Sequence, residues 1–140
     1  MKIVGGAVIV ALLTIGAIDG ARADSGTEKT ATTAALAWLA LIDGGRYAES
    51  WKEASGYFRG AVTVEKWEAS LRGVRTPLGQ VVSRQVRSAK EATTLPGAPD
   101  GHYVVMEFAT AFARKASAIE TVTFVQDDGG RWRAAGYFIR

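Results

Sequence analysis

Apolar residues recur at helical spacing in the part of the chain that follows residue 24. Ala35, Trp38 and Ile42 are three or four positions apart, which is typical of the buried side of a helix. The segment Ser25–Glu28, SGTE, is a capping box, with a serine at the cap and a glutamate three residues later. We therefore predict a helix that begins after this box and ends near Asp43, just before two glycines.

Two shorter helices are predicted next. One covers residues 46–55 and ends at Gly56, and the other covers residues 64–73 with Thr63 as its cap. The aromatic-rich segment 57–60 between them is expected to be a connector.

The second half of the chain alternates between apolar and polar residues, which is the pattern of strands. This pattern predicts four strands, over residues 80–89, 102–113, 117–126 and 131–139, with a proline- and glycine-rich loop at 93–101. Helices first and strands second predict an α+β fold. In this fold the N-terminal helices pack on one face of a four-stranded antiparallel meander sheet.

Residues 1–23 have the features of a secretory signal peptide. The apolar run 3–18 has no charge, and Ala21–Ala23, ARA, is an A-x-A cleavage site. The run is shorter than the roughly 20 residues that a membrane-spanning helix needs. We therefore expect cleavage after Ala23, a single domain over residues 24–140, a periplasmic or secreted location, and no stable membrane insertion after cleavage.

The composition of the chain excludes several classes of partner and of chemistry. The chain has 17 Lys and Arg residues against 14 Asp and Glu, and the basic residues are scattered, which together with export argues against nucleic acid as a partner. The absence of cysteine excludes disulfides and thiol chemistry, and a single histidine leaves none of the usual zinc ligand sets. We expect no metal and no cofactor.

Hairpin geometry predicts which residues share a face of the sheet. A turn centred on residues 128–129 pairs Glu120 with Tyr137, and a turn centred on residues 115–116 pairs Glu120 with Ala111. One face is then a plain apolar core made of Val104, Met106, Phe108, Phe112, Ile119, Val125, Trp132 and Phe138. The second face is also apolar but carries charges, and its members are Tyr103, Val105, Glu107, Ala109, Glu120, Val122, Phe124, Arg133, Ala135, Tyr137 and Ile139. That face is either the wall of a pocket or a dimer interface.

Four charged residues and one tyrosine stand out as candidate binding residues: Arg84, Glu107, Glu120, Arg133 and Tyr137. A charge inside an apolar surface needs a partner, and a guanidinium can hold a carboxylate through two parallel hydrogen bonds. We therefore predict a structural ion pair between one of the two glutamates and one of the two arginines. The alternative is a pocket carboxylate that acts as a general base. No residue is predicted to be catalytic.

Other candidates have ordinary structural explanations. His102 follows a turn, where a histidine is usually solvated, and Asp127–Asp128 belongs to a hairpin turn. The helical half also carries several aromatic residues, among them Trp38, Trp51, Tyr57, Phe58 and Trp67. Such residues more often form the core than line a pocket for an apolar or aromatic ligand.

Four segments of the chain resemble an exported bacterial family, domain of unknown function 4019. They are WKEASGYFRGAVTVEKW, RTPLGQVVSRQV, LPGAPDGHYVVMEF and ETVTFVQDDGGRWRAAGYFIR, and the resemblance extends over about Ala35 to Arg140. It implies no activity, substrate or catalytic residue. The order of helices and strands is also similar to the cystatin-like or nuclear-transport-factor-2-like architecture, in which helices pack across a curved sheet and often leave a conical pocket.

These observations favour an exported, non-enzymatic domain that binds a small apolar ligand or a protein, with homodimerisation through the second face as one form of it. One alternative is a lyase or isomerase that uses Glu107 or Glu120 as its single pocket carboxylate. The other is an envelope structural or stress factor that has no ligand.

Overall fold

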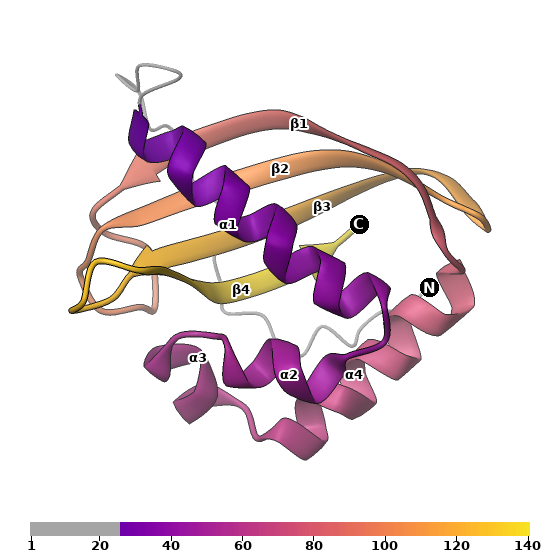
Figure 1. The fold of residues 1–140 in the computed structure, drawn as a ribbon, viewed down its shortest axis with the longest axis horizontal. Helices are drawn as coiled ribbons and strands as arrows, with labels where there is room; N and C mark the ends of the chain where they lie inside the picture. Colours follow the sequence, from indigo (N-terminus) through magenta and orange to yellow (C-terminus); the bar gives the residue numbers. More distant parts are fainter. Residues whose placement is uncertain (1–25) are drawn as a thin grey trace.

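The computed structural model describes residues 26–140, in which four helices precede four strands (Figure 1). Neighbours in the sheet are neighbours along the chain, and every pairing is antiparallel. The prediction of an α+β fold with a four-stranded antiparallel meander is confirmed. The signal peptide predicted over residues 1–23 lies outside the described residues. The elements are α1 (Gly26–Asp43), α2 (Tyr47–Lys52), α3 (Gly56–Ala61), α4 (Val64–Leu78), β1 (Val81–Ala92), β2 (Tyr103–Phe112), β3 (Lys115–Gln126) and β4 (Trp132–Ile139).

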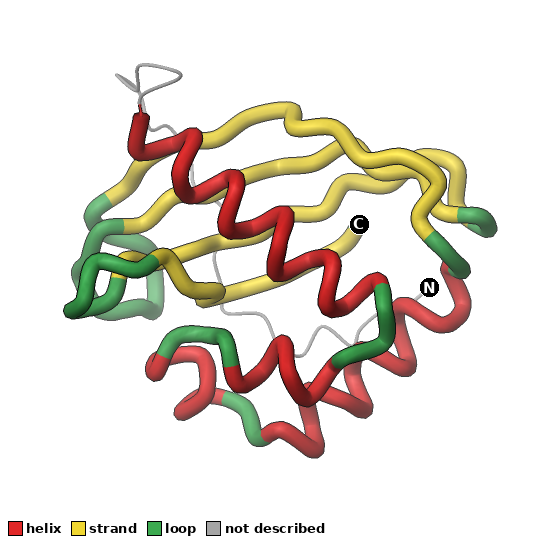
Figure 2. The backbone as a smooth tube through the Cα atoms, in the orientation of Figure 1, coloured by secondary structure: helices red, strands yellow, loops and turns green. Residues whose placement is uncertain are grey.

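Helix α1 ends at the predicted residue and lies across all four strands, while α2, α3 and α4 gather beyond the β4 edge (Figures 1 and 2). The aromatic residues of these helices form the core. The ring centroids of Trp38 and Trp67 are 6.0 Å apart, and the ring of Phe58 stands edge-on to Trp67 at 4.9 Å. The core interpretation of Trp38 and Trp67 is therefore confirmed.

Three features of the helices differ from the prediction. The helix predicted over residues 46–55 is shorter, because α2 ends at Lys52. The segment predicted as a connector is helix α3, because the Ser55 hydroxyl accepts a hydrogen bond from the Phe58 N–H (3.1 Å) and so caps a helical turn that buries Phe58. Helix α4 continues past Gly73 to Leu78. A glycine weakens a helix without ending it, and here the turn that follows it carries the buried Arg75.

The predicted strand pairing was wrong. The turn between β2 and β3 consists of residues 113–114 instead of being centred on 115–116, and the register shifts by one residue between Thr110 and Phe112. Glu120 therefore pairs with Phe108 rather than with Ala111. A shift by an odd number of positions turns one strand over relative to its neighbour. Relative to β2, each residue of β3 therefore lies on the face of the sheet opposite to the one predicted from the sequence.

The β3–β4 pairing also moved, but by two positions. Glu120 pairs with Ile139 instead of Tyr137, and the register shifts at Thr123–Phe124. A shift by an even number keeps faces, so Glu120 and Tyr137 still lie on one side.

The sheet consequently has a helix face and an outer face. The helix face packs against α1 and carries Val104, Met106, Phe108, Glu120, Val122, Phe124 and Tyr137. The opposite side, which we call the outer face, carries Glu107, Ile119, Val125 and Phe138. The expectation that the last three share the face of Met106 was wrong.

One end of the outer face is covered by the loop between β1 and β2. Leu95 of this loop forms a small buried cluster with Tyr103, Val105 and Ala135. The Tyr103 hydroxyl donates a hydrogen bond to the Pro99 carbonyl at 2.6 Å, which holds the loop in place. The open part of the outer face is therefore the end that carries Ile119 and Phe138.

Candidate functional site

A buried carboxylate lies at the centre of the helix face. Glu120 has no exposed surface. Its Oε1 accepts hydrogen bonds from Arg84 Nε at 2.7 Å and from the Thr110 hydroxyl at 2.6 Å. Its Oε2 accepts from Arg84 Nη2 at 3.1 Å and from the Tyr137 hydroxyl. The carboxylate has about four acceptor positions, and all of them are occupied.

Arg84 joins this carboxylate to a second one. From the edge strand β1, its Nη1 donates to Asp43 Oδ2 at 2.8 Å and its Nη2 donates to Asp43 Oδ1 at 3.1 Å. The guanidinium thus holds one carboxylate on each side, with the two-bond geometry that arginine favours. The predicted structural ion pair is present as Glu120–Arg84.

Asp43 also binds a second arginine. It is the last residue of α1, where the negative end of the helix dipole is unfavourable for an acid. Arg75 of α4 compensates by donating from Nη2 to Asp43 Oδ1 at 2.8 Å, and its guanidinium carbon lies 5.0 Å from the centre of the Phe112 ring. Nε and Nη1 of Arg75 are buried and have no hydrogen-bond partner within residues 26–140. We call Asp43, Arg75, Arg84, Thr110, Glu120 and Tyr137 the charge network.

The pKa values agree with this pairing. Burial alone would raise the pKa of Asp43, but the hydrogen bonds from Arg84 and Arg75 outweigh it, so this pKa is lowered. Burial raises the pKa of the Tyr137 hydroxyl well above its usual value, and the nearby charge of Glu120 raises it further. Burial would lower the pKa of Arg84, but its bonds to Asp43 and Glu120 raise it. At neutral pH the tyrosine is therefore a hydrogen-bond donor to Glu120, and Asp43 is a carboxylate held by two arginines.

The two other charged candidates lie elsewhere. Glu107 is on the outer face, and its Oε atoms lie 3.9 Å from Arg87 Nη1 and 3.5 Å from Arg140 Nη2. Arg133 binds the hairpin turn through Asp127 Oδ2 at 2.7 Å and reaches the carbonyl of Glu53 at 3.1 Å. The prediction that both share a face with Glu120 was wrong, because it depended on the hairpin register.

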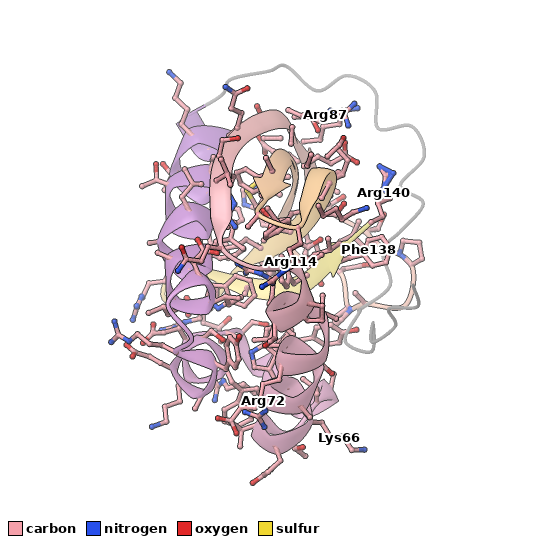
Figure 3. The ribbon with its side chains drawn as sticks, turned by 90° about the vertical axis from the view of Figure 1, so that its right-hand side faces the viewer. Lys66, Arg72, Arg87, Arg114, Phe138 and Arg140 are labelled. Carbon is pink, nitrogen blue, oxygen red and sulfur yellow. The ribbon has the colours of Figure 1, made fainter. Side chains whose placement is uncertain are left out.

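Glu107 lies in an open region of the outer face. Thr121 pairs with Glu107 on one side and with Phe138 on the other, so these three form a row across the sheet. The Phe138 side chain is 39% exposed, and the two arginines beside Glu107 are more than half exposed. Figure 3 shows Arg87, Phe138 and Arg140 on the side of the sheet away from α1. We call Arg87, Glu107, Ile119, Phe138 and Arg140 the outer patch.

Sequence reasoning missed three members of the charge network. Asp43 carried a signal, since an acid at a helix C-terminus opposes the dipole. Arg75 carried another, because it continues the apolar stripe four residues after Leu71. Thr110 alternates with phenylalanines on a buried strand, which also indicates a polar group that needs a partner.

The remaining candidates are held by neighbours. His102 Nδ1 lies 3.1 Å from Gln126 Oε1, and its Nε2 lies 3.3 Å from Glu91 Oε1. Asp127 Oδ1 accepts hydrogen bonds from two N–H groups of its own turn, at 3.0 and 2.9 Å, and the hydrogen bond from Arg133 lowers the pKa of this carboxyl. Within residues 26–140, no cluster of three potential metal ligands occurs, and no helix has the length and apolar character needed to cross a membrane.

Comparison with known proteins gives one match. A family model described as "Protein of unknown function (DUF4019)" matches residues 34–137. No curated protein and no solved structure matches the chain significantly. The matched range contains the whole charge network, from Asp43 to Tyr137.

Proposed function

Since the chain belongs to the DUF4019 family, whose function is unknown, we propose a function from the two faces of its sheet. The protein is an exported, non-enzymatic binding domain that recognises a protein partner through the outer patch. The signal-like sequence of residues 1–23 supports the export part of this proposal.

The contrast between the two faces carries the proposal. On the helix face, the ion pairs are joined by hydrogen bonds of 2.7 to 3.1 Å, and the carboxylate of Glu120 has all its acceptor positions occupied. On the outer face, Glu107 lies 3.5 and 3.9 Å from its two arginines, and Phe138 is exposed beside it. Aromatic and arginine side chains are the residues that most often anchor protein interfaces. The side chains of the outer patch are therefore available to bind a partner, whereas the acceptor positions of Glu120 in the charge network are already occupied.

Glu120 has a structural role in this proposal. A general base needs a free lone pair within hydrogen-bond reach of a substrate proton. The donors on Glu120 come from Arg84, Thr110 and Tyr137, and the side chain has no exposed surface. Catalysis at this carboxylate would require the fold to release its main ion pair, so we assign no reaction to it.

A position-specific crosslink tests the proposal. A photo-reactive amino acid replaces Phe138 in the full chain, in cells that export it, and the control carries it at Leu36 on α1, whose exposure is 40% against 39% for Phe138. We expect one discrete protein adduct from position 138 and none from position 36, with loss of the adduct when Glu107→Lys is added. Equal labelling from both positions, or no adduct from position 138, would overturn the proposal.

A further inference from the structure

We infer that the partner of the outer patch is a second copy of this chain, bound face to face about a two-fold axis. This inference rests on the proposed function and names the partner at the same surface. Three properties of the patch carry it: the order of its charges, the shape of its apolar part and the position of its open end.

The charges of the outer patch are self-complementary. Glu107 lies between Arg87 and Arg140, so a negative charge is flanked by positive ones. A uniformly acidic partner would place like charge against Glu107, and a uniformly basic partner would place like charge against both arginines. In a two-fold contact, residue i meets residue j and j meets i. Glu107 of each copy can then face Arg140 of the other copy, which gives two equivalent ion pairs.

The apolar part of the patch suits the packing of two sheets. Phe138 and Ile119 have large side chains, while Ala109 and Thr121, which share the outer face with them, are smaller. Two sheets pack face to face at about 10 Å, with side chains from both inner faces filling the space. The larger side chains of one copy would lie over the small ones of the other, which removes the exposed Phe138 and the half-buried Ile119 from water.

The loop between β1 and β2 limits where the second copy binds. Leu95 and Tyr103 already close the far end of the outer face, so it is not available. The contact is therefore centred on the end that carries Ile119 and Phe138. Here Glu107 and Arg140 have side chains 32% and 55% exposed, so both are accessible to the second copy.

A charge-exchange experiment tests the inference on the exported protein, by native mass spectrometry and sedimentation equilibrium. Glu107→Arg alone brings arginine against arginine across the axis, and Arg140→Glu alone brings glutamate against glutamate. Each single variant should weaken dimerisation by roughly tenfold or more. A one-to-one mixture of the two variants restores opposite charges at both contacts, so we expect a heterodimer to form from two weakly associating partners. Glu49→Arg on α2 reverses a half-exposed charge outside the patch and should leave the dimer intact.

The outcomes separate this inference from the proposed function. A wild-type monomer together with a crosslinked adduct of another mass from position 138 would overturn the second copy but keep the binding surface. A wild-type monomer with no adduct would overturn both. A dimer that neither single variant weakens, or a mixture that does not recover, would show that the copies meet elsewhere and overturns the inference.

Discussion

Glu120 and Arg84 are charged residues whose need for a partner can be predicted from the sequence. Each interrupts an apolar pattern on its strand, and from this alone the sequence analysis predicted an ion pair. The pair is present, with the side chain of Glu120 fully buried. Its partners Asp43 and Arg75 were not predicted, because only the packing of α1 and α4 at this end of the sheet brings them together.

Replacing the buried carboxylate should destabilise the fold. In Glu120→Gln, the charge that compensates Arg84 is lost, while Arg84 keeps its bonds to Asp43. We expect the free energy of unfolding to fall by about 3 kcal/mol, which is the lower end for a broken buried pair. Urea denaturation measures it, and Glu49→Gln, on the half-exposed surface of α2, should change stability by less than about 0.5 kcal/mol. An unchanged urea midpoint for Glu120→Gln would contradict the structural role.

The two arginines of the charge network should differ in importance. Arg84→Met removes the partner of the sealed Glu120 and should cost about 3 kcal/mol or more. Arg75→Met leaves Asp43 bound to Arg84 and also removes two buried guanidinium nitrogens that have no hydrogen-bond partner in the described part of the chain. Its cost should stay within about 1 kcal/mol. Chemical denaturation of both variants compares them directly, and equal losses would show that the two arginines act as one unit.

Elements were easier to predict than the faces they present. The four strands were placed within a few residues, because alternation and turn residues mark them in the sequence. The side on which each residue lies depends on turn position and on bulges. The turn at 113–114 and the register shift between Thr110 and Phe112 together move the pairing of Glu120 by three positions, and the register shift makes that number odd. Because this shift is odd, Val122 and Phe138 each lie on the face opposite to the predicted one, relative to β2. A bulge inserts one extra residue into one strand of a pair, and the alternation of apolar and polar residues does not mark where it lies.

Two glycines of α4 should respond in opposite ways to alanine. Gly73 is inside the helix, and a Cβ there would meet no atom within 4 Å. Gly73→Ala should therefore stabilise the protein by about 0.5–1 kcal/mol. Gly79 ends the helix with a φ of 80°, and a Cβ would lie 3.0 Å from the Ala113 Cβ, so Gly79→Ala should destabilise it. Thermal unfolding distinguishes the two, and shifts of the same sign would contradict the assigned end of α4.

The joint between α1, α4 and β1 should weaken in acid. The folded-state pKa of Asp43 is lowered below its usual value of 3.8 by Arg84 and Arg75, against the raising effect of burial. A group with a depressed folded pKa stabilises the fold above its unfolded pKa, and this contribution is lost as pH falls through the folded pKa. We expect stability to decline from about pH 4 downward, and Asp43→Asn to flatten that decline.

The measurement for this joint is the free energy of unfolding in urea at several pH values. Asp128→Asn in the exposed hairpin turn is the control for losing one carboxylate. If Asp43→Asn kept the wild-type slope below pH 4, the carboxylate would not be the group that links the three elements.

At the scale of the whole molecule, the described residues 26–140 contain a sheet with one side covered by helices, the closed side, and one side that is partly uncovered, the open side. On the closed side, α1 and the aromatic core cover a sheet face whose buried charges are paired across three elements. On the open side, an exposed phenylalanine lies beside a carboxylate with two loosely engaged arginines. The sequence analysis expected an apolar second face with charges on it. That face exists and carries Glu107 as predicted, but Glu120 lies on the opposite face, and the charges beside Glu107 are Arg87 and Arg140.

The decisive measurement is sedimentation equilibrium of the purified protein beside two variants, Phe138→Asp on the outer face and Leu36→Asp on α1. The wild-type side chains at these positions are 39% and 40% exposed. We predict that the wild type and Leu36→Asp are dimers and that Phe138→Asp is a monomer with an unchanged fold by circular dichroism. If Phe138→Asp remained a dimer, or if Leu36→Asp dissociated equally, the outer patch would not be the surface through which this protein acts.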